Sequence, residues 1–539
     1  MRRLISIVAI PTALLALFLA CGNSGNGGSS SGGTNGGDAG SPSNSASSEG
    51  GTFFGLGADS SSGGGGGGVD GGVVGAVPCP AGLQCNVACS GGATTSISGK
   101  VYDPAKKDPL YNVAVYVPAT PLQPLPKGVP TGADACSCAA LYKSGGIAST
   151  STGADGSFKL TGAPAGSAVP LVLQIGKWRR LVTINVTACQ DNPQADKSLA
   201  LPGTVAPGDT DDNMPDIAVS TGYADSLECL MLRMGIPANE YVAGPAGTGH
   251  VHVYAGGQPG TAPPGTAAIG YPEAHPMPGA PESDKNLWDS PAHLMPFDIT
   301  LLSCEGAETY NANPSVLEAY LNAGGRVFAS HYHYSWFAGV LLQPEDPQTY
   351  SPPADWGSNL ANWHTDIVNA LPDGGQDLGP VGGSIDQTLN GSSAPFPKGQ
   401  ALLQWLGVVN ALGQNGVPAQ QASIYQPRYN AVVGSSNTTS QSWITSTGGV
   451  PNQTMYFSFD TPVNAPAPPD GGLPNYCGRT VFSDLHVAGN PSTKDISPPP
   501  AGCQSVDLSP QEKVLEFMLF DLSSCVAPDR IVPPVGPVF

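Results

Sequence analysis

Residues 320–331 read YLNAGGRVFASH, and residues 478–486 read GRTVFSDLH. The first stretch predicts the end of a helix at Gly324-Gly325, because glycine readily adopts the backbone conformation that closes a helix. A short apolar strand is then expected over 326–330. The second stretch predicts another strand of the same kind. Helices that alternate with short buried strands are typical of an α/β fold.

The region around these two stretches continues the alternation. Asp225 is the expected N-cap of a helix with apolar residues at helical spacing, and the last helix begins with Ser509-Pro510 and Glu512, a typical helix start. The predicted strands are 216–222, 249–255, 297–304, 326–330 and 479–486, and the predicted helices are 225–235, 315–323 and 509–522. We therefore predict a flavodoxin-like α/β domain with a parallel sheet over 210–527. A β-rich insertion over 337–455 is expected to form a lid or a binding wall over the strand ends.

Polar side chains follow four of the predicted strands. Ligands in parallel sheets usually bind at the carboxyl ends of the strands, so side chains gathered there indicate a site. The residues at these ends are Ser220, Thr221, Ser303, Cys304, Glu305, Ser330, His331, His333, Ser483, Asp484 and His486. We expect them to share one edge of the sheet.

An earlier region, 93–200, has a different pattern. Apolar residues alternate along short segments, and turn residues such as those of Ala154–Ser157 separate the segments. Such spacing predicts an antiparallel β-sandwich. The expected strands are 94–101, 113–117, 158–160, 171–175 and 181–186.

The N-terminus predicts export. Arg2 and Arg3 precede an apolar stretch that ends at Cys21, which is typical of a bacterial lipoprotein signal over 1–21 with Cys21 as the lipidated residue. Gly22 after the cysteine favours the outer membrane, in the cell envelope. The Gly/Ser-rich residues 22–76 predict a disordered tether, because such a chain buries too little apolar surface to fold. A Cys-containing connector over 77–92 follows it, and 528–539 form a C-terminal tail.

Composition excludes some functions. The chain has 539 residues with 72 glycines and 54 prolines, and only 12% of its residues are charged, which argues against a largely helical protein. The net charge of −20 makes a nucleic-acid partner unexpected, because an acidic surface repels phosphates.

The cysteines agree with export. Of the 12 cysteines, 11 remain beyond Cys21, so disulfides are expected to leave at least one thiol free. The close pairs Cys85/Cys89 and Cys136/Cys138 are interpreted as disulfide cysteines in preference to zinc ligands, because no matching second pair with histidine follows.

The sandwich region resembles the carboxypeptidase regulatory-like family. The resemblance lies in Gly99–Asp103, Pro109–Val115, Asp155–Phe158 and Pro164–Gly166. It implies a transthyretin-like sandwich of the carbohydrate-binding-like group, whose members serve as spacers, stability modules or binding modules.

The α/β region is similar to class I glutamine amidotransferase-like domains, and within them to the trehalose-utilisation-like branch. The similarity rests on 320–331 and 478–486, where a Gly-Gly strand ends near a histidine. In the amidotransferases a nucleophilic cysteine follows the strand, whereas here Ser330-His331 stands there, so amidase chemistry is not implied. The whole chain also resembles uncharacterised exported myxobacterial lipoproteins. Some of these carry the label tryptophan synthase alpha chain, but the eight βα repeats that this label requires are not found in the sequence.

Three interpretations of the polar edge remain open. The first is a site for a divalent metal such as zinc or iron. His331 and His333 are two residues apart, so both rings face one side of an extended chain. His486 or Asp484 would complete the ligand set, with Glu305 assisting.

The second interpretation is a hydrolase. Either Cys304 or Ser330 would be the nucleophile with a histidine as base. A disulfide from Cys304, for example to Cys229, would remove the thiol from such chemistry.

The third interpretation, which we favour, is a non-catalytic envelope protein that binds a glycan or a peptide. His331, His333, Tyr334 and Trp336 would line its binding surface. The remaining histidines are expected to have no site role; they are His250, His252, His275, His293 and His364.

Overall fold

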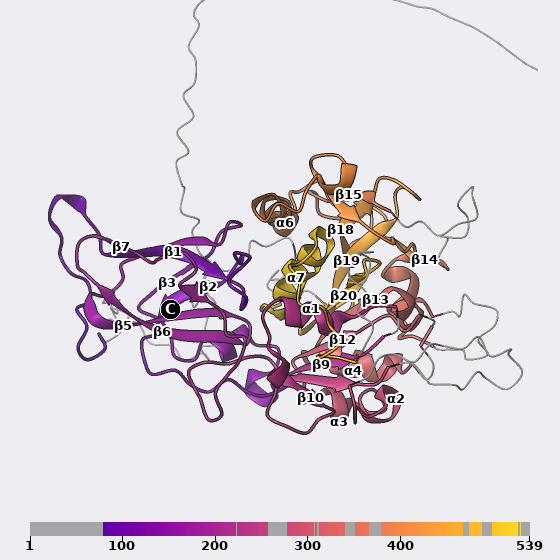
Figure 1. Cartoon of the computed structure of the whole chain (residues 1–539), viewed down its shortest axis with the longest axis horizontal. Coiled ribbons are helices and arrows are strands. Elements are labelled where there is room, and N and C mark those ends of the chain that lie inside the picture. Colours follow the sequence, from indigo (N-terminus) through magenta and orange to yellow (C-terminus); the bar gives the residue numbers. More distant parts are fainter. Residues whose placement is uncertain are drawn as a thin grey trace, which may run out of the picture. The chain divides into compact units, whose positions relative to one another are not determined.

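The structure is a computed structural model of the whole chain (Figure 1). The residues that it describes are 79–222, 224–256, 277–306, 308–309, 312–339, 351–365, 379–466, 474–487, 498–526 and 529. The predicted signal peptide with Cys21, the tether, most of the C-terminal tail and His275 lie outside them.

The smaller domain consists of two β-sheets. In one, β1 pairs antiparallel with β4 and parallel with β7 and β8. In the other, all neighbours are antiparallel, in the order β3-β2-β5-β6. The strands are β1 (Ser96–Tyr102), β2 (Ala114–Val117), β3 (Ala148–Ser151), β4 (Ser157–Thr161), β5 (Gly166–Ile175), β6 (Trp178–Val186), β7 (Asp191–Pro193) and β8 (Leu199–Ala200).

The five strands expected from the sequence are β1, β2, β4, β5 and β6. β3 was not predicted, because its sequence ASTS has no large apolar residue and all four of its residues are only partly buried. β7 and β8 are too short to show any alternation.

The larger domain is built on a ten-stranded mixed sheet (Figure 1). Its order is β10-β11-β9-β12-β13-β20-β19-β18-β15-β16. The pairs from β10 to β20 are parallel, and those from β20 to β16 are antiparallel. The strands are β9 (Ile217–Ser220), β10 (Tyr241–Ala243), β11 (Val251–Tyr254), β12 (Ile299–Leu302), β13 (Arg326–Ser330), β15 (Val381–Ile385), β16 (Gln421–Ile424), β18 (Ser440–Ser446), β19 (Thr454–Thr461) and β20 (Gly478–Ser483), with a separate ribbon of β14 (Asn362–Trp363) and β17 (Ala431–Val432).

The described part of the predicted insertion corrects one expectation. We expected a lid or wall over the strand ends, but β15, β16 and β18 extend the sheet sideways, because β18 forms an antiparallel ladder with β19. Arg428 and Asn430 of the insertion do contact the end of β20, where their backbone N–H groups donate to Asp484. Other segments of the insertion lie outside the described residues.

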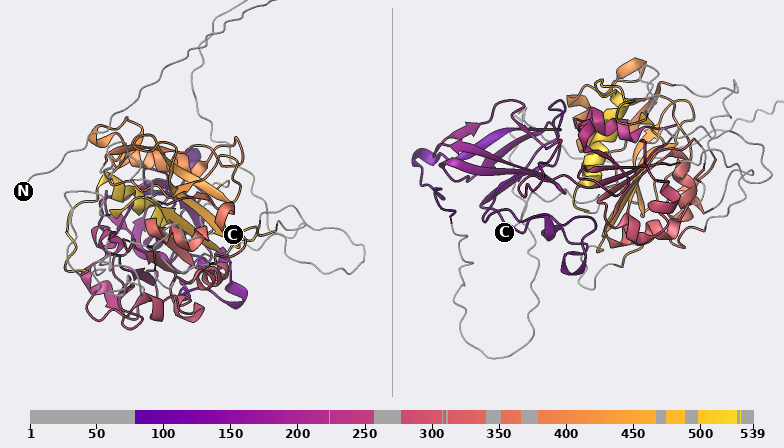
Figure 2. Two further views of the ribbon diagram at one scale, coloured as in Figure 1. Left: turned by 90° about the vertical axis from the view of Figure 1, so that its right-hand side faces the viewer. Right: turned by 60° about the horizontal axis from the view of Figure 1, so that its bottom comes forward.

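Helices cover both faces of the sheet (Figure 2). They are α1 (Leu227–Arg233), α2 (Ser283–Asn286), α3 (Pro291–Leu294), α4 (Pro314–Ala323), α5 (Tyr334–Ala338), α6 (Pro397–Val408) and α7 (Pro510–Ser523). Successive side chains of a strand point to opposite faces. Accordingly, Phe328 and Val481 pack in the cluster that contains α1, α6 and α7, whereas Ala329 and Phe482 pack with α4 and α5.

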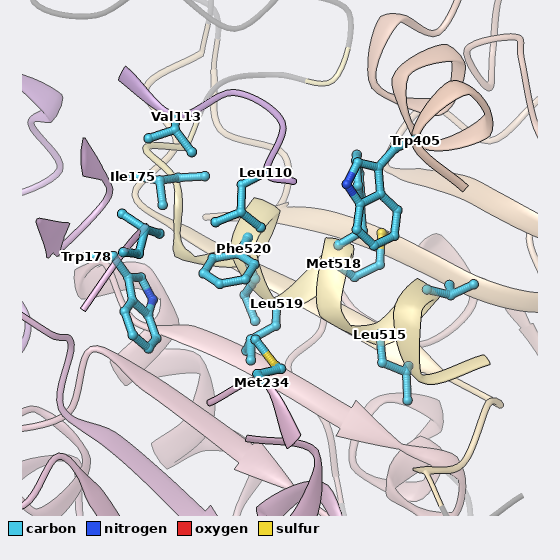
Figure 3. Close-up of a cluster of buried hydrophobic side chains, with 14 of the residues drawn as sticks. Leu110, Val113, Ile175, Trp178, Met234, Trp405, Leu515, Met518, Leu519 and Phe520 are labelled. Atoms are coloured by element: carbon cyan, nitrogen blue, oxygen red, sulfur yellow. The ribbon is translucent and has the colours of Figure 1, made fainter. Parts of the chain in front are cut away.

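The first of these clusters also joins the two domains. Figure 3 shows side chains of the smaller domain beside those of α7. The ring centroids of Trp178 and Phe520 are 5.7 Å apart, and Tyr111 stacks on Phe517 at the same distance. Gly176 has φ +55°, and a Cβ there would lie 1.8 Å from the carbonyl oxygen of Ser523, so only glycine fits this close approach.

Covalent and ionic links reinforce the junction. Cys136 and Cys138 of the smaller domain form disulfides with Cys477 and Cys525 of the larger one. The Nζ of Lys177 binds the carboxylate of Asp298, and both side chains are about 90% buried. These links hold the smaller domain at the amino ends of the large sheet's parallel strands, since Asp298 directly precedes β12.

Candidate functional site

Three neighbouring parallel strands each deliver one candidate ligand to the carboxyl edge of the large sheet. Cys304 lies two residues after β12, His331 directly follows β13, and His486 lies three residues after β20. The strand order β12-β13-β20 places these ends side by side. The sheet therefore brings together residues that are far apart in the sequence.

The three side chains form a tight buried group. The Sγ of Cys304 lies 3.2 Å from the Nδ1 of His331, and the ring centroids of His331 and His486 are 5.1 Å apart. One ligand atom from each of the three residues lies within 4.8 Å of the other two. The exposed fractions of Cys304, His331 and His486 are 0%, 2% and 1%. Such spacing is suited to one small ion between the three groups.

The backbone at His331 leaves the extended conformation. Its φ is +41°, a left-handed value that is uncommon outside glycine and that costs about 1–3 kcal/mol. His331–His333 form a 3₁₀ turn, which corrects our expectation of an extended chain with both imidazoles on one side. His333 instead turns its Nδ1 toward the carbonyl oxygen of Ser330, at 2.9 Å, and does not belong to the group.

Burial disfavours the charged forms of Cys304 and His486. Burial, together with the charges of His331 and Arg428, lowers the pKa of His486 well below its usual value. Burial raises the pKa of the Cys304 thiol to about 12, although backbone N–H groups of Tyr332 and Gly306 that donate to the sulfur act in the opposite direction. Neutral imidazole is the form that binds metal ions.

His486 lacks the contacts that a buried histidine normally makes. Both of its ring nitrogens are buried, and neither has a hydrogen-bond partner among the described residues. Leaving a buried polar group unsatisfied costs about 1–3 kcal/mol. One of these nitrogens lies within 4.8 Å of the ligand atoms of Cys304 and His331, so an ion between the three residues would bind that nitrogen.

Asp225 is a residue of this site that the sequence analysis assigned elsewhere. We expected it to cap α1, but Ser226 is the residue that precedes the helix. The Oδ2 of Asp225 accepts a hydrogen bond from Ser330 at 2.7 Å, and its Oδ1 accepts one from the backbone N–H of Val487 at 2.7 Å. The sequence could have indicated this role, because Asp225 lies five residues after β9, whose carboxyl end is at the same edge of the sheet.

The other predicted site residues have structural contacts. Asp484 accepts a hydrogen bond from the backbone N–H of Asn430 at 2.9 Å. Glu305 is buried at the same edge but does not belong to the three-residue group. Ser330 makes the hydrogen bond to Asp225.

Tyr334 and Trp336 lie in the interior. Both have exposed fractions of 0%, as does His333. Trp336 packs edge-on against Trp288, with the ring centroids 5.2 Å apart. These rings form no exposed platform in the structure, so they lend no support to stacking on a sugar.

The disulfides settle the state of Cys304. Five disulfides join Cys79 to Cys85, Cys89 to Cys189, Cys136 to Cys477, Cys138 to Cys525, and Cys229 to Cys503. The suggested bridge between Cys304 and Cys229 is wrong, because Cys229 pairs with Cys503. Cys304 is the one free cysteine of the described residues, which confirms the expected unpaired thiol.

These disulfides indicate an oxidising location outside the cytoplasm. Among the described residues, no helix has the length and apolar character to cross a membrane.

Comparison with known protein families and with curated proteins finds no match.

A metal centre suits the geometry better than a thiol nucleophile. Reactive cysteines have lowered pKa values and some exposure, whereas Cys304 has a raised pKa and is fully buried. A Cys–His pair would also leave His486 unexplained. One thiolate and two imidazoles are ligands that zinc and similar metals prefer, and three protein ligands leave a fourth position open.

Proposed function

We propose that this chain is an exported metal-binding protein of the cell envelope. Its larger domain binds one divalent transition-metal ion, with zinc the best match, through Cys304, His331 and His486. The observation that carries the proposal is the buried group itself, in which both ring nitrogens of His486 lack another partner among the described residues. This keeps the binding role that the sequence suggested but changes the ligand from a glycan or peptide to a metal ion.

The ligand types support zinc or a related metal. Thiolate and imidazole suit zinc, copper and iron, whereas calcium and magnesium prefer oxygen ligands. Metal binding would deprotonate Cys304, since the thiolate is the ligand form. The N–H groups of Tyr332 and Gly306 that point at the sulfur support a negatively charged thiolate there.

A metal-dependent hydrolase is the second candidate. Catalytic zinc sites have three protein ligands and one open position that water or substrate occupies. Three protein ligands would leave that fourth position for water, and this count favours the candidate. Metal binding alone is common to both functions, so it is tested first.

The proposed location is the outer membrane, with lipidated Cys21 as the anchor. The five disulfides support export. The two-sheet smaller domain is compatible with a carboxypeptidase regulatory-like module. The parallel half of the large sheet supports a relationship to the amidotransferase-like fold, with His331 in the place of the nucleophile. We expect Cys21→Ser to release the protein from the membrane fraction.

The test is elemental analysis of the full chain after export to a bacterial periplasm. We expect about one zinc per chain after dialysis, and less than a tenth of that in Cys304→Ser and His486→Ala. His333→Ala is the matched control, because His333 is equally buried nearby but lies outside the group; this variant should keep the metal. A metal-free wild type after incubation with zinc, or full occupancy in His486→Ala, would overturn the proposal.

A further inference from the structure

Ala224 and Asp225, which lie between β9 and α1, contact the chain at or next to all three proposed metal ligands. The backbone N–H of Ala224 donates to the carbonyl oxygen of Cys304 at 3.0 Å. The carboxylate of Asp225 accepts hydrogen bonds from Ser330, which precedes His331, and from Val487, which follows His486. One short segment thus fixes the three strand ends relative to one another.

The carboxylate of Asp225 is buried, and both of its oxygens accept hydrogen bonds. Its side chain is 1% exposed, and besides Ser330 and Val487 it accepts a hydrogen bond from the backbone N–H of Ser226 at 3.0 Å. A buried carboxylate is costly unless such donors satisfy it. The three donors come from three separate segments, so their common feature is the edge of the sheet where the ligands lie.

The same loop lies directly on Cys304. A Cβ at Gly222 would lie 2.1 Å from the carbonyl oxygen of Cys304, so the two backbones are in close contact. The position of Cys304 therefore depends on the path of this loop.

We propose that Asp225 is the positioning residue of the metal site. It does not touch the ion, but it holds the backbone beside His331 and His486 so that their rings converge on Cys304. Residues that orient ligands in this way typically change metal affinity by 10- to 100-fold when they are replaced. The inference rests on the proposed metal-binding function.

The substitution Asp225→Asn tests this role with little change in volume. An amide can keep its oxygen for the N–H groups of Val487 and Ser226, but its NH₂ group would turn the Ser330 hydroxyl from donor to acceptor, and the loss of the negative charge weakens all three hydrogen bonds. We expect zinc to bind 10- to 100-fold more weakly, as measured by competition with a chromophoric chelator. In the cobalt-substituted protein, the thiolate-to-cobalt absorption band should shift or weaken.

Two further variants serve as a control and as a substitute for Asp225→Asn. Asp386→Asn is the matched control, because Asp386 directly follows β15 and its partly buried carboxylate accepts hydrogen bonds from Ser442 and Thr445 of β18, in the antiparallel half of the sheet. It should lower thermal stability without changing zinc affinity or the cobalt spectrum. Ser330→Ala removes one of the three donors, and we expect a several-fold weaker affinity; this variant replaces Asp225→Asn if the latter does not fold.

The outcomes separate the two proposals. A wild type that binds no metal defeats the metal-binding function and this inference with it. A wild type that binds zinc, with unchanged affinity and cobalt spectrum in folded Asp225→Asn or in Ser330→Ala, overturns only the positioning role. If metal-free Asp225→Asn melts at a lower temperature but binds zinc as tightly as the wild type, Asp225 only stabilises the fold, and the positioning role is likewise overturned.

Discussion

The Sγ of Cys304 lies 3.2 Å from the Nδ1 of His331, although the two residues follow different strands. Their contact exists because β12 and β13 are adjacent and parallel, so that both strands end at the same edge. β20 pairs with the other side of β13 and adds His486. The order of the strands thus brings together three side chains that are far apart in the sequence.

The state of Cys304 gives the first prediction. Because the other ten described cysteines are paired, a Cys21→Ser chain should show one reactive thiol when it is denatured without reductant. In the native protein with zinc, alkylation of this thiol should be at least tenfold slower than in the denatured chain, because the sulfur is buried and metal-bound. Two or more thiols under denaturing conditions would contradict the disulfide pattern, which mass spectrometry of the alkylated peptides can check.

The backbone at His331 gives the second prediction. His331→Gly and His331→Ala both remove the imidazole, but only glycine adopts a φ of +41° without strain. We expect the glycine variant to be more stable than the alanine variant by about 1 kcal/mol in urea unfolding. At a position with ordinary φ the order is reversed, so a more stable alanine variant would show that the left-handed conformation is not retained.

Glu516 gives a pH prediction at the domain junction. Its side chain is fully buried on α7, and burial, followed by the charges of Asp103 and Asp108, raises its pKa well above the usual value; Lys513 acts in the opposite direction. An acid whose pKa is higher in the folded state holds its proton more tightly there. The stability that Glu516 contributes is therefore fully present below its unfolded pKa of about 4.3 and is lost as the pH rises above it.

Unfolding in urea between pH 5 and pH 8 measures this effect. The slope that one such group contributes is at most about 1.4 kcal/mol per pH unit. Glu516→Gln should flatten the curve, whereas Glu282→Gln, at an exposed position, should leave it unchanged. An identical slope in Glu516→Gln and the wild type would show that Glu516 is ionised throughout.

The disulfides between the domains give the fourth prediction. Cys136 and Cys477 are 341 positions apart, whereas Cys79 and Cys85 are only six positions apart. A disulfide that closes a longer loop restricts the unfolded chain more. Because Cys138–Cys525 stays intact and joins the same segments, the loop that Cys136–Cys477 closes has about 50 residues. Replacing Cys136 and Cys477 by serine should therefore lower the free energy of unfolding by about 2 kcal/mol more than replacing Cys79 and Cys85. Equal losses in the two double variants would mean that loop length does not govern their stabilisation.

Local patterns predicted much of the secondary structure. The capping box of α7 is present as expected, because the side chains of Ser509 and Glu512 each bond the backbone of the other residue. The strands β9, β12, β13 and β20 were found because each is a short apolar run beside a turn or a helix. The polar residues at their ends were visible for the same reason, and the structure brings Cys304, His331 and His486 of this set together.

The sequence by itself determined five strands of the smaller domain, the main parallel strands and helices of the larger one and the unpaired cysteine, since these depend on neighbouring residues or on a count. The antiparallel half of the large sheet corrects the prediction of a parallel sheet, because its pairing depends on distant segments. Only the tertiary structure decided that His331 and not His333 joins Cys304, because a left-handed residue replaced the extended chain. It also decided that Asp225 bonds three segments instead of capping a helix, and which cysteines pair across as many as 387 positions. These outcomes depend on strand order and on contacts between distant segments, which local spacing does not encode.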